Sequence, residues 1–117
     1  MTTEHQQTVH RYMEGFRRSD HEAILACLTD DVLWIIYGAR TTNGKAEFDD
    51  EIENPSFEGS PELTVDRVFE DGDAVIVTGT GRGRHREAGP FQFAYNDIFT
   101  FRGDLIAQVD SYVVPLG

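Results

Sequence analysis

The sequence offers little with which to cross-link the chain, bind nucleic acid or span a membrane. Its 117 residues include one cysteine, Cys27, which cannot form an internal disulfide. Lys and Arg total 10 against 21 Asp and Glu, and the net charge of -11 argues against a phosphate-backbone partner. No apolar run approaches the ~20 residues that a membrane-spanning helix requires. We therefore expect neither nucleic acid nor a membrane among its partners.

The first residues also lack the features of a targeting signal. Met1 leads into a polar run, residues 2–7, without a basic start or an apolar stretch. Together with the single cysteine, this composition predicts a cytoplasmic protein in which Cys27 is a small buried helix residue.

Motifs that would hold a metal or a cofactor are missing as well. The four histidines have no metal-ligand spacing. The glycine-rich stretch 79–83 lies late in an expected strand with no helix after it, which does not suit a phosphate loop or a dinucleotide fingerprint. No Gly-x-Ser-x-Gly elbow for a nucleophilic serine occurs. We expect no metal and no cofactor.

The length and the hydrophobic content of 39% suit one domain over residues 1–117. Thr3 with Gln6 is a capping-box pattern, and the apolar stripe that follows it predicts a first helix. Ser19 with Glu22 repeats the pattern and predicts a second helix. The β-branched and aromatic run 32–37 then predicts a buried strand.

The remaining sequence predicts a third short helix and then an antiparallel meander. Residues 41–44 are a turn signal before a helix expected over 45–53. Strands are expected over 63–70, 74–84, 91–102 and 105–114, with turn chemistry at each break. The fold class that follows is α+β.

One basic concentration, residues 82–86, is expected at the end of a strand. It is either a solvated hairpin end or a small positive mouth that attracts an anionic ligand. The composition favours the solvated hairpin end.

A carboxyl lies in the middle of the strongest strand pattern, residues 91–101. Period-2 alternation places Asp97 on one face with four aromatic residues, Phe93, Tyr95, Phe99 and Phe101. Burial there would raise the Asp97 pKa, and the group would be neutralised or given a partner, as functional carboxylic acids are. The alternative is that this face is wet, or that Asp97 receives an ordinary structural hydrogen bond.

The element order resembles the cone-shaped α+β fold of nuclear transport factor 2-like proteins, in which a curved antiparallel or mixed sheet wraps around amino-terminal helices like an α+β barrel. Residues 9–13, 19–24 and 28–32 are similar to the opening of ketosteroid isomerases and polyketide cyclase (SnoaL)-like proteins. Residues 43–45 and 96–106 are similar to theirs too, with Tyr112 downstream. These scaffold motifs are shared by proteins with many activities, so the resemblance implies fold more directly than function.

The resemblance to ketosteroid isomerases implies part of a catalytic set. Tyr12 matches their oxyanion-hole tyrosine, and Asp97 matches the protonated aspartic acid that shares the oxyanion. The general-base aspartate of that family falls at Ile36, so this base is missing. For Tyr12, the alternative is an aromatic side chain that only fills the core.

A second base, known from the cyclase-like and epoxide-hydrolase-like relatives, is missing too. Their carboxylate on the last strand falls at Val114 here. Alternation places Asp110 on the face of Ile106 and Tyr112, from which it could reach the same cavity as Asp97 and serve as a base. The alternative is a charge at the rim or at an interface.

These observations and the resemblance predict a small-molecule-binding protein with an apolar pocket. Tyr12 and Asp97 would donate hydrogen bonds to a carbonyl, enol or phenol oxygen of a small apolar ligand. The pocket residues expected are Trp34, Ile36, Tyr37, Phe93, Tyr95, Phe99, Tyr112 and Val114. If the protein is an enzyme, it would be a cofactor-independent isomerase, cyclase or lyase with Tyr12, Asp97 and Asp110 as catalytic candidates. The alternative is a non-catalytic dimeric binding or interaction module with the same fold.

The resemblance also implies a homodimer, because the outer face of such a curved sheet needs a cover. Alternation makes five residues candidates for that outer face: Ile98, Thr100, Ala107, Val109 and Val113.

Overall fold

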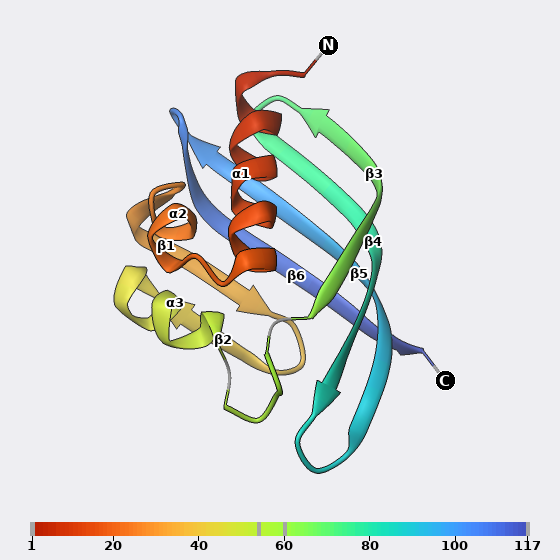
Figure 1. Ribbon diagram of the computed structural model, residues 1–117. Helices are drawn as coiled ribbons and strands as arrows, with labels where there is room; N and C mark the ends of the chain where they lie inside the picture. Colours follow the sequence, from red (N-terminus) through yellow and green to blue (C-terminus); the bar gives the residue numbers. More distant parts are fainter. Residues whose placement is uncertain (1, 54, 60, 117) are drawn as a thin grey trace.

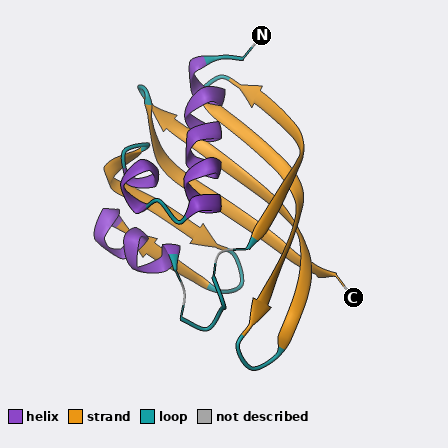
Figure 2. Cartoon of the chain, viewed as in Figure 1, coloured by secondary structure: helices purple, strands orange, loops and turns teal. Residues whose placement is uncertain are grey.

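The computed structural model describes residues 2–53, 55–59 and 61–116. In these residues three helices lie on one face of a single curved sheet (Figures 1 and 2). The helices are α1 (Glu4–Arg18), α2 (His21–Leu25) and α3 (Gly44–Ile52). The strands are β1 (Leu28–Ile36), β2 (Arg40–Asn43), β3 (Glu62–Asp71), β4 (Ala74–His85), β5 (Gly89–Arg102) and β6 (Leu105–Leu116). This architecture confirms the predicted α+β fold.

The six strands form one sheet in the order β2-β1-β6-β5-β4-β3, which curves around the helices without closing into a barrel (Figure 1). β3 to β6 are the predicted antiparallel meander, and β1 pairs with β6 in parallel. The prediction of a turn at residues 41–44 is wrong. The chain turns earlier, where Gly38 has a φ of 82° and Ala39 N–H bonds to Ile36 O, so residues 40–43 return as β2.

The first helix begins as predicted, whereas the second begins one residue later. The Thr3 hydroxyl accepts a hydrogen bond from the N–H of Gln6 at 3.1 Å. Ser19 ends α1 in the left-handed conformation with a φ of 51°, so it cannot cap α2. Asp20 does so instead, accepting from the N–H of Ala23 at 3.1 Å.

The core lies between α1 and the concave face of the sheet. The predicted stripe of α1 faces it, with Val9, Tyr12 and Met13 each no more than 4% exposed. The side chains that are almost fully buried are Phe48, Phe99, Ile24, Leu28, Ile106, Val32, Val75, Val77 and Val109. Each burial of a side chain of this size contributes roughly 1.5–3 kcal/mol, so this cluster holds α1 and α3 against the sheet.

A β-bulge interrupts the pairing of β5 with β6. Phe101 pairs with Ile106, but Thr100 pairs with Gln108, which leaves Ala107 without a partner. One extra residue in a strand moves every later side chain to the opposite face from the one that unbroken alternation predicts.

The bulge overturns part of the predicted outer face. Val109 is fully buried in the core, and Val113 lines the cavity described below. The prediction for these two residues is wrong because it assumed unbroken alternation. Ile98 lies before the bulge and does face outward, since its cross-strand partners are Ile76 and Asp110.

His21 links α2 to α3 and should make the stability of the fold depend on pH. Its Nδ1 lies 2.5 Å from Asp49 and its Nε2 lies 3.4 Å from Glu53, and the hydrogen bond to Asp49 is the main cause of its raised pKa. A raised folded-state pKa stabilises the fold fully below the unfolded pKa of ~6.5, and this stabilisation is lost as pH rises through the folded value. We expect His21→Ala to lower the free energy of unfolding in urea at pH 6 by up to ~1 kcal/mol, since the pair is partly exposed, and by less at pH 9.

Asp49→Asn is the control for this prediction, because it removes the main partner and should reduce the pH dependence of the His21→Ala effect. An equal loss at both pH values would show that the charged pair contributes nothing.

Candidate functional site

A cavity of about 260 Å³ lies between the helices and the concave face of the sheet. Its wall is mostly apolar and comes from α1, β1, α3 and the long strands β4 to β6. Its polar lining includes Tyr12, Asp97 and Ser111, and the more exposed Arg40 and Arg84 mark its open end.

Asp97 is held by a chain of hydrogen bonds across three strands. Asp97 on β5 and Ser111 on β6 are cross-strand partners, so their side chains lie on the same face. Trp34 Nε1–H donates to Ser111 Oγ at 2.9 Å, and the Ser111 hydroxyl donates to the Asp97 carboxylate. This chain fixes the position of the carboxyl in the cavity wall.

Burial raises the pKa of Asp97 to about 6, and the hydrogen bond from Ser111 offsets part of that rise. The direction is the one predicted from the sequence. A carboxyl with this pKa is mostly ionised at pH 7 and mostly protonated below pH ~5. At neutral pH Asp97 is therefore a hydrogen-bond acceptor or a base, and it becomes a donor only in acid.

Tyr12 supplies the donor of the site. Its ring packs against Phe16 and Phe99 with centroid distances of 5.0 Å to each. Burial, and then the charge of Asp97, raise the pKa of the Tyr12 phenol well above its usual range, so it keeps its proton. Among the described residues, none accepts a hydrogen bond from this hydroxyl. Tyr12 and Asp97 therefore do not satisfy each other.

Several predicted pocket residues do meet at the cavity. Trp34 and Ile36 line it from β1, while Phe93 and Tyr95 line it from β5. Phe99 does not reach the wall. It is fully buried and supports the Tyr12 ring from below with an edge-to-face contact.

Four other predicted site residues lie on the outer face of the sheet. Asp110, Tyr112 and Val114 follow the bulge in β6, which turns them away from Asp97, so the expectation that Asp110 shares its cavity is wrong. Tyr37 follows β1 and stacks on Tyr112 with a centroid distance of 4.4 Å. The predictions of Tyr112 and Val114 as pocket walls are wrong for the same reason, the reversed parity of β6. The prediction of Tyr37 is wrong because it directly follows Ile36, which faces the cavity.

These outer residues form a polar cluster of their own. The Tyr37 hydroxyl donates to Asp110 Oδ1 at 2.9 Å, and Gln108 Nε2 donates to the same carboxyl at 3.1 and 3.2 Å. Hydrogen bonds with Tyr112 and Asp110 raise the pKa of Tyr37. Asp110 is thus held by neighbours on the face opposite the cavity.

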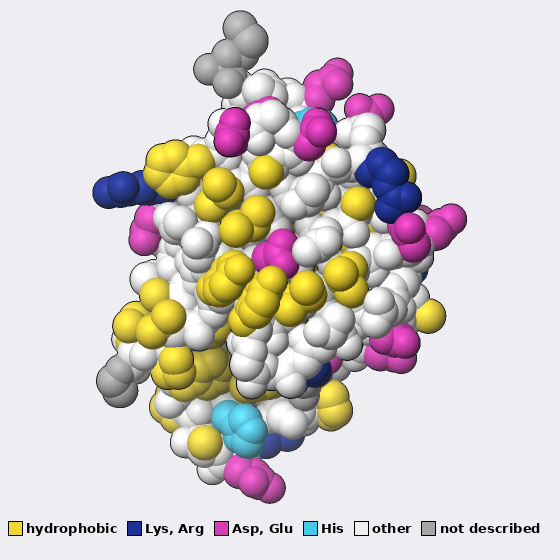
Figure 3. Space-filling view, turned by 180° about the vertical axis from the view of Figure 1, so that it is seen from behind, with side chains coloured by type: hydrophobic (Ala, Val, Ile, Leu, Met, Phe, Trp, Pro, Cys, Tyr) yellow, Lys and Arg dark blue, Asp and Glu magenta, His cyan; other side chains and the backbone are white. Residues whose placement is uncertain are grey.

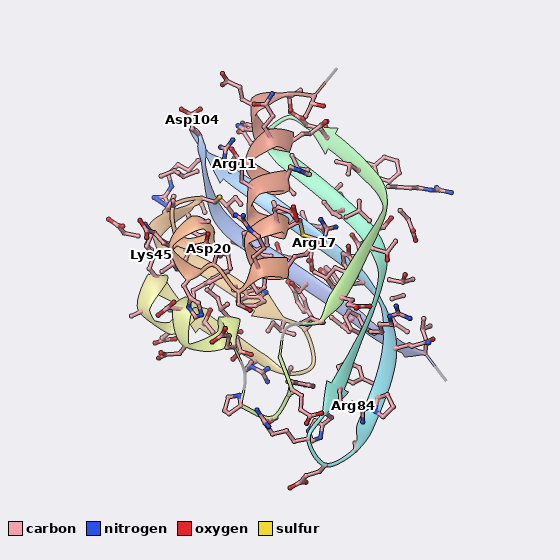
Figure 4. All side chains as sticks on the ribbon, viewed as in Figure 1. Arg11, Arg17, Asp20, Lys45, Arg84 and Asp104 are labelled. Carbon is pink, nitrogen blue, oxygen red and sulfur yellow. The ribbon has the colours of Figure 1, made fainter. Side chains whose placement is uncertain are left out.

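The cavity opens between two arginines whose charges are balanced. Arg40 pairs with Glu51 of α3 at 2.5 Å. Arg84, which is labelled on β4 in Figure 4, lies 3.5 Å from Glu58. The backbone N–H of Glu58 also bonds to Arg84 O at 2.9 Å, which fastens the loop that follows α3 to the end of β4.

The other arginines of the basic stretch are engaged as well. Arg82 pairs with Glu62 at 2.6 Å, and Arg86 Nε donates to Pro55 O at 2.8 Å. These contacts favour the solvated hairpin end over a positive mouth.

Several cavity residues were not anticipated from the sequence. Ser111 is the most important, because it is the hydrogen-bond donor to Asp97. Phe57, Phe91 and Leu63 extend the apolar wall toward the open end. Aligning β5 with β6 places Ser111 opposite Asp97 only when the bulge at Ala107 is included in the register.

Two further observations concern metals and membranes. Within residues 2–53, 55–59 and 61–116, no group of three or more His, Cys, Asp or Glu side chains is placed to hold a metal ion. In that same part of the chain, no helix combines the length and the apolar character needed to cross a membrane.

Solved structures with the same arrangement come from several bacteria. An NTF2-like protein of unknown function from Burkholderia pseudomallei K96243 is 22% identical and has a TM-score of 0.85, covering 94% of this chain and 90% of its own. An LEH-like epoxide hydrolase from M. tuberculosis is 20% identical with a TM-score of 0.82, covering 96% and 84%. A candidate polyketide cyclase from Xanthomonas campestris pv. campestris is 24% identical with a TM-score of 0.82, covering 93% and 89%. These likenesses define the fold as NTF2-like.

The family follows from the sequence itself. The SnoaL-like domain matches residues 9–109, so this chain belongs to the SnoaL-like domain family. No curated protein matches the chain.

Replacing Asp97 with Asn should stabilise the fold at neutral pH. The folded-state pKa of about 6 lies above the unfolded value of ~3.9, so the folded state binds more protons between these values and loses stability as pH rises through them. We expect Asp97→Asn to raise the free energy of unfolding by up to ~3 kcal/mol at pH 7.5, because one pKa unit corresponds to ~1.4 kcal/mol. The gain should vanish near pH 4, and denaturant unfolding at the two pH values measures it.

Ser111→Ala provides the matched test of the cause. It removes the hydrogen bond that lowers the Asp97 pKa, so NMR titration should show a further rise. An Asp97 pKa near the model-peptide value of ~3.9 in the unmodified protein would contradict both expectations.

Proposed function

We propose that this protein binds a small, largely apolar ligand through a carbonyl, enol or phenol oxygen. The observation that carries the proposal is the convergence of Tyr12 and Asp97 on one apolar cavity. Tyr12 is a permanent donor with no partner among the described residues, and Asp97 accepts at neutral pH and donates in acid. Membership of the SnoaL-like family supports a small-molecule site.

If the ligand is a substrate, the pair suits cofactor-independent isomerisation, cyclisation or elimination through an enolate. Ionised Asp97 takes a proton from the carbon beside a carbonyl, and Tyr12 donates a hydrogen bond to the oxygen as negative charge develops there. The proton held on Asp97 returns to the substrate at another atom, which restores the carboxylate. Asp97 would thus act as the base, in place of the neutral acid expected from the resemblance.

The second candidate is a binding module that performs no reaction. It is favoured by Ile36, which lines the cavity with an apolar side chain where ketosteroid isomerases are expected to carry their base. Two carboxyls line the cavity, and both have partners, because Asp97 is bonded to Ser111 and Glu51 is paired with Arg40. In this case the cavity would hold its ligand without transforming it.

We also propose that the protein is a homodimer joined through the outer face of the sheet. This face is bare of helices, and hydrophobic side chains gather across it with an acidic one among them (Figure 3). One cross-strand row runs through five strands: Phe69, Ile76, Ile98, Asp110 and Ile35. Phe69 and Val114 are 48% and 58% exposed, and a second copy of the same face would cover them.

Binding of 2-naphthol, a fluorescent phenol, tests the proposed site. We expect Tyr12→Phe to weaken binding roughly threefold to tenfold, the value of one hydrogen bond, and Asp97→Ala to weaken it as well. Tyr37→Phe and Asp110→Ala are matched controls on the outer face and should leave the affinity unchanged. Fluorescence titration gives the dissociation constants of the unmodified protein and of the four variants.

Turnover by the unmodified protein and by Ile36→Asp separates binding from catalysis. Isomerisation of a β,γ-unsaturated ketone should be negligible, because Ile36 occupies the position from which ketosteroid isomerases are expected to take the proton of such a substrate. Ile36→Asp should raise the rate, since a base in that position typically contributes ~10² to 10⁴-fold. Fast turnover by the unmodified protein would instead assign Asp97 as an efficient base. Loss of 2-naphthol binding in the outer-face controls alone would contradict the proposed site.

Sedimentation velocity at micromolar concentration tests the homodimer. We expect a dimer that Val114→Asp converts largely to monomer, because it replaces an apolar side chain that is 58% exposed on this face with a charge that the interface leaves unpaired. Val68→Asp is the matched control, since Val68 is 45% exposed but pairs with the inward-facing Val77 on β4. A monomeric unmodified protein would rule out this interface.

A further inference from the structure

Three glycines of β4 face three aromatic residues of β5 across the sheet. Gly79 pairs with Tyr95, Gly81 with Phe93, and Gly83 with Phe91. The glycine-rich stretch that suits no phosphate loop therefore has a different role, which is a packing role on the concave face.

Each glycine provides the space in which an aromatic side chain lies. A Cβ added at Gly81 would come within 2.3 Å of Phe93 Cζ, and one at Gly83 within 3.0 Å of Phe91 Cζ. One added at Gly79 would come within 1.9 Å of Thr64 O on β3 and within 2.8 Å of the Tyr95 hydroxyl, so this glycine also makes room for the β3 backbone. The rings thus lie down over the glycines, where any side chain on β4 would lift them into the cavity.

The three rings form a continuous surface along the cavity. Phe91 and Phe93 are stacked with an interplanar angle of 25° and a centroid distance of 5.8 Å. Tyr95 follows Phe93 at 6.3 Å, with its ring tilted by 54°. This surface leads from the open end, where Phe57 lies 5.5 Å from Phe91, toward Asp97 two residues beyond Tyr95 on the same strand. All four aromatic residues line the cavity.

We propose that Gly81 and Gly83 determine the specificity of the cavity, because they hold Phe93 and Phe91 flat and so select a ligand with an elongated, flat ring system. The inference rests on the proposed function, since it places the ligand oxygen at Tyr12 and Asp97. The rings of the ligand extend from there past the tilted ring of Tyr95 and over Phe93 and Phe91 toward the open end. Aromatic faces prefer offset stacking on one another, which a puckered saturated ring cannot provide.

Three probes separate binding of the ligand oxygen from stacking of the ligand rings. 2-Naphthol reports the oxygen site, 2-hydroxyanthracene adds one flat terminal ring, and 5,6,7,8-tetrahydro-2-hydroxyanthracene carries the same carbon atoms with that ring saturated. Burial of apolar area alone predicts no advantage for the aromatic terminal ring. Stacking predicts that 2-hydroxyanthracene binds roughly threefold to tenfold more tightly than its tetrahydro derivative.

Gly81→Ala tests the role of the glycines. We expect it to remove the preference for the aromatic terminal ring and to weaken 2-hydroxyanthracene at least tenfold, while 2-naphthol changes much less. Gly83→Ala makes a milder contact and should lower the preference in part, and Phe91→Leu should lower it without any strain on β4. Thr80→Ala, on the opposite face between Gly79 and Gly81, is the control and should bind all three probes as the unmodified protein does.

The outcomes distinguish this inference from the function on which it rests. If 2-naphthol does not bind, the proposed function fails and the specificity role falls with it. If 2-naphthol binds but the aromatic and saturated probes bind equally, or Gly83→Ala and Phe91→Leu leave their ratio unchanged, the oxygen site stands and the role of the glycines is overturned.

Discussion

The unpaired residue in β6 is the constraint on which the site depends. Because Ala107 has no partner on β5, Ser111 lies opposite Asp97 inside the cone and Asp110 lies outside it. With unbroken pairing, the cavity would gain the Asp110 carboxyl and lose the hydroxyl that orients Asp97. A single inserted residue therefore decides both the charge of the cavity and the character of the outer face.

Burial in the apolar core affects the stability of the fold in two opposite ways around Asp97. Burial of Phe99, Val109 and their neighbours stabilises the fold, and the same burial penalises the charge of the carboxyl beside them. The hydrogen bond from Ser111 recovers only part of that cost. This uncompensated cost supports the proposed functional role of Asp97, because carboxyls with perturbed pKa values occur preferentially at functional sites.

Much of the fold follows from local signals in the sequence. The cap at Thr3, the stripe of Val9, Tyr12 and Met13, and the turns between the long strands each act over a few residues, and each was predictable. The face of Asp97 was predictable too, since β5 alternates without interruption along the residues before Arg102.

The parts that sequence reasoning missed depend on contacts between distant segments. Nothing near Ala107 marks it as a bulge, because apolar residues occur on both sides of it at both parities. The strand Arg40–Asn43 is polar and short, so its pairing with Trp34 and its neighbours decides its conformation. Ser19 and Asp20 are both good caps, and the choice between them is made by the close approach of α1 and α2 at Gly15, where an added Cβ would come within 2.7 Å of Ile24.

The glycines of β4 lower the stability of the sheet but leave space for the cavity on its concave face. Glycine weakens a strand and adds no apolar area, so three of them on one face oppose the stability of the sheet. Their cross-strand partners offset this weakness, because the rings of Tyr95, Phe93 and Phe91 cover the exposed backbone. Side chains in their place would fill the cone and extend the core through it. The concave face therefore stays hollow from Asp97 to the open end only because aromatic residues of β5 lie where β4 has no side chains.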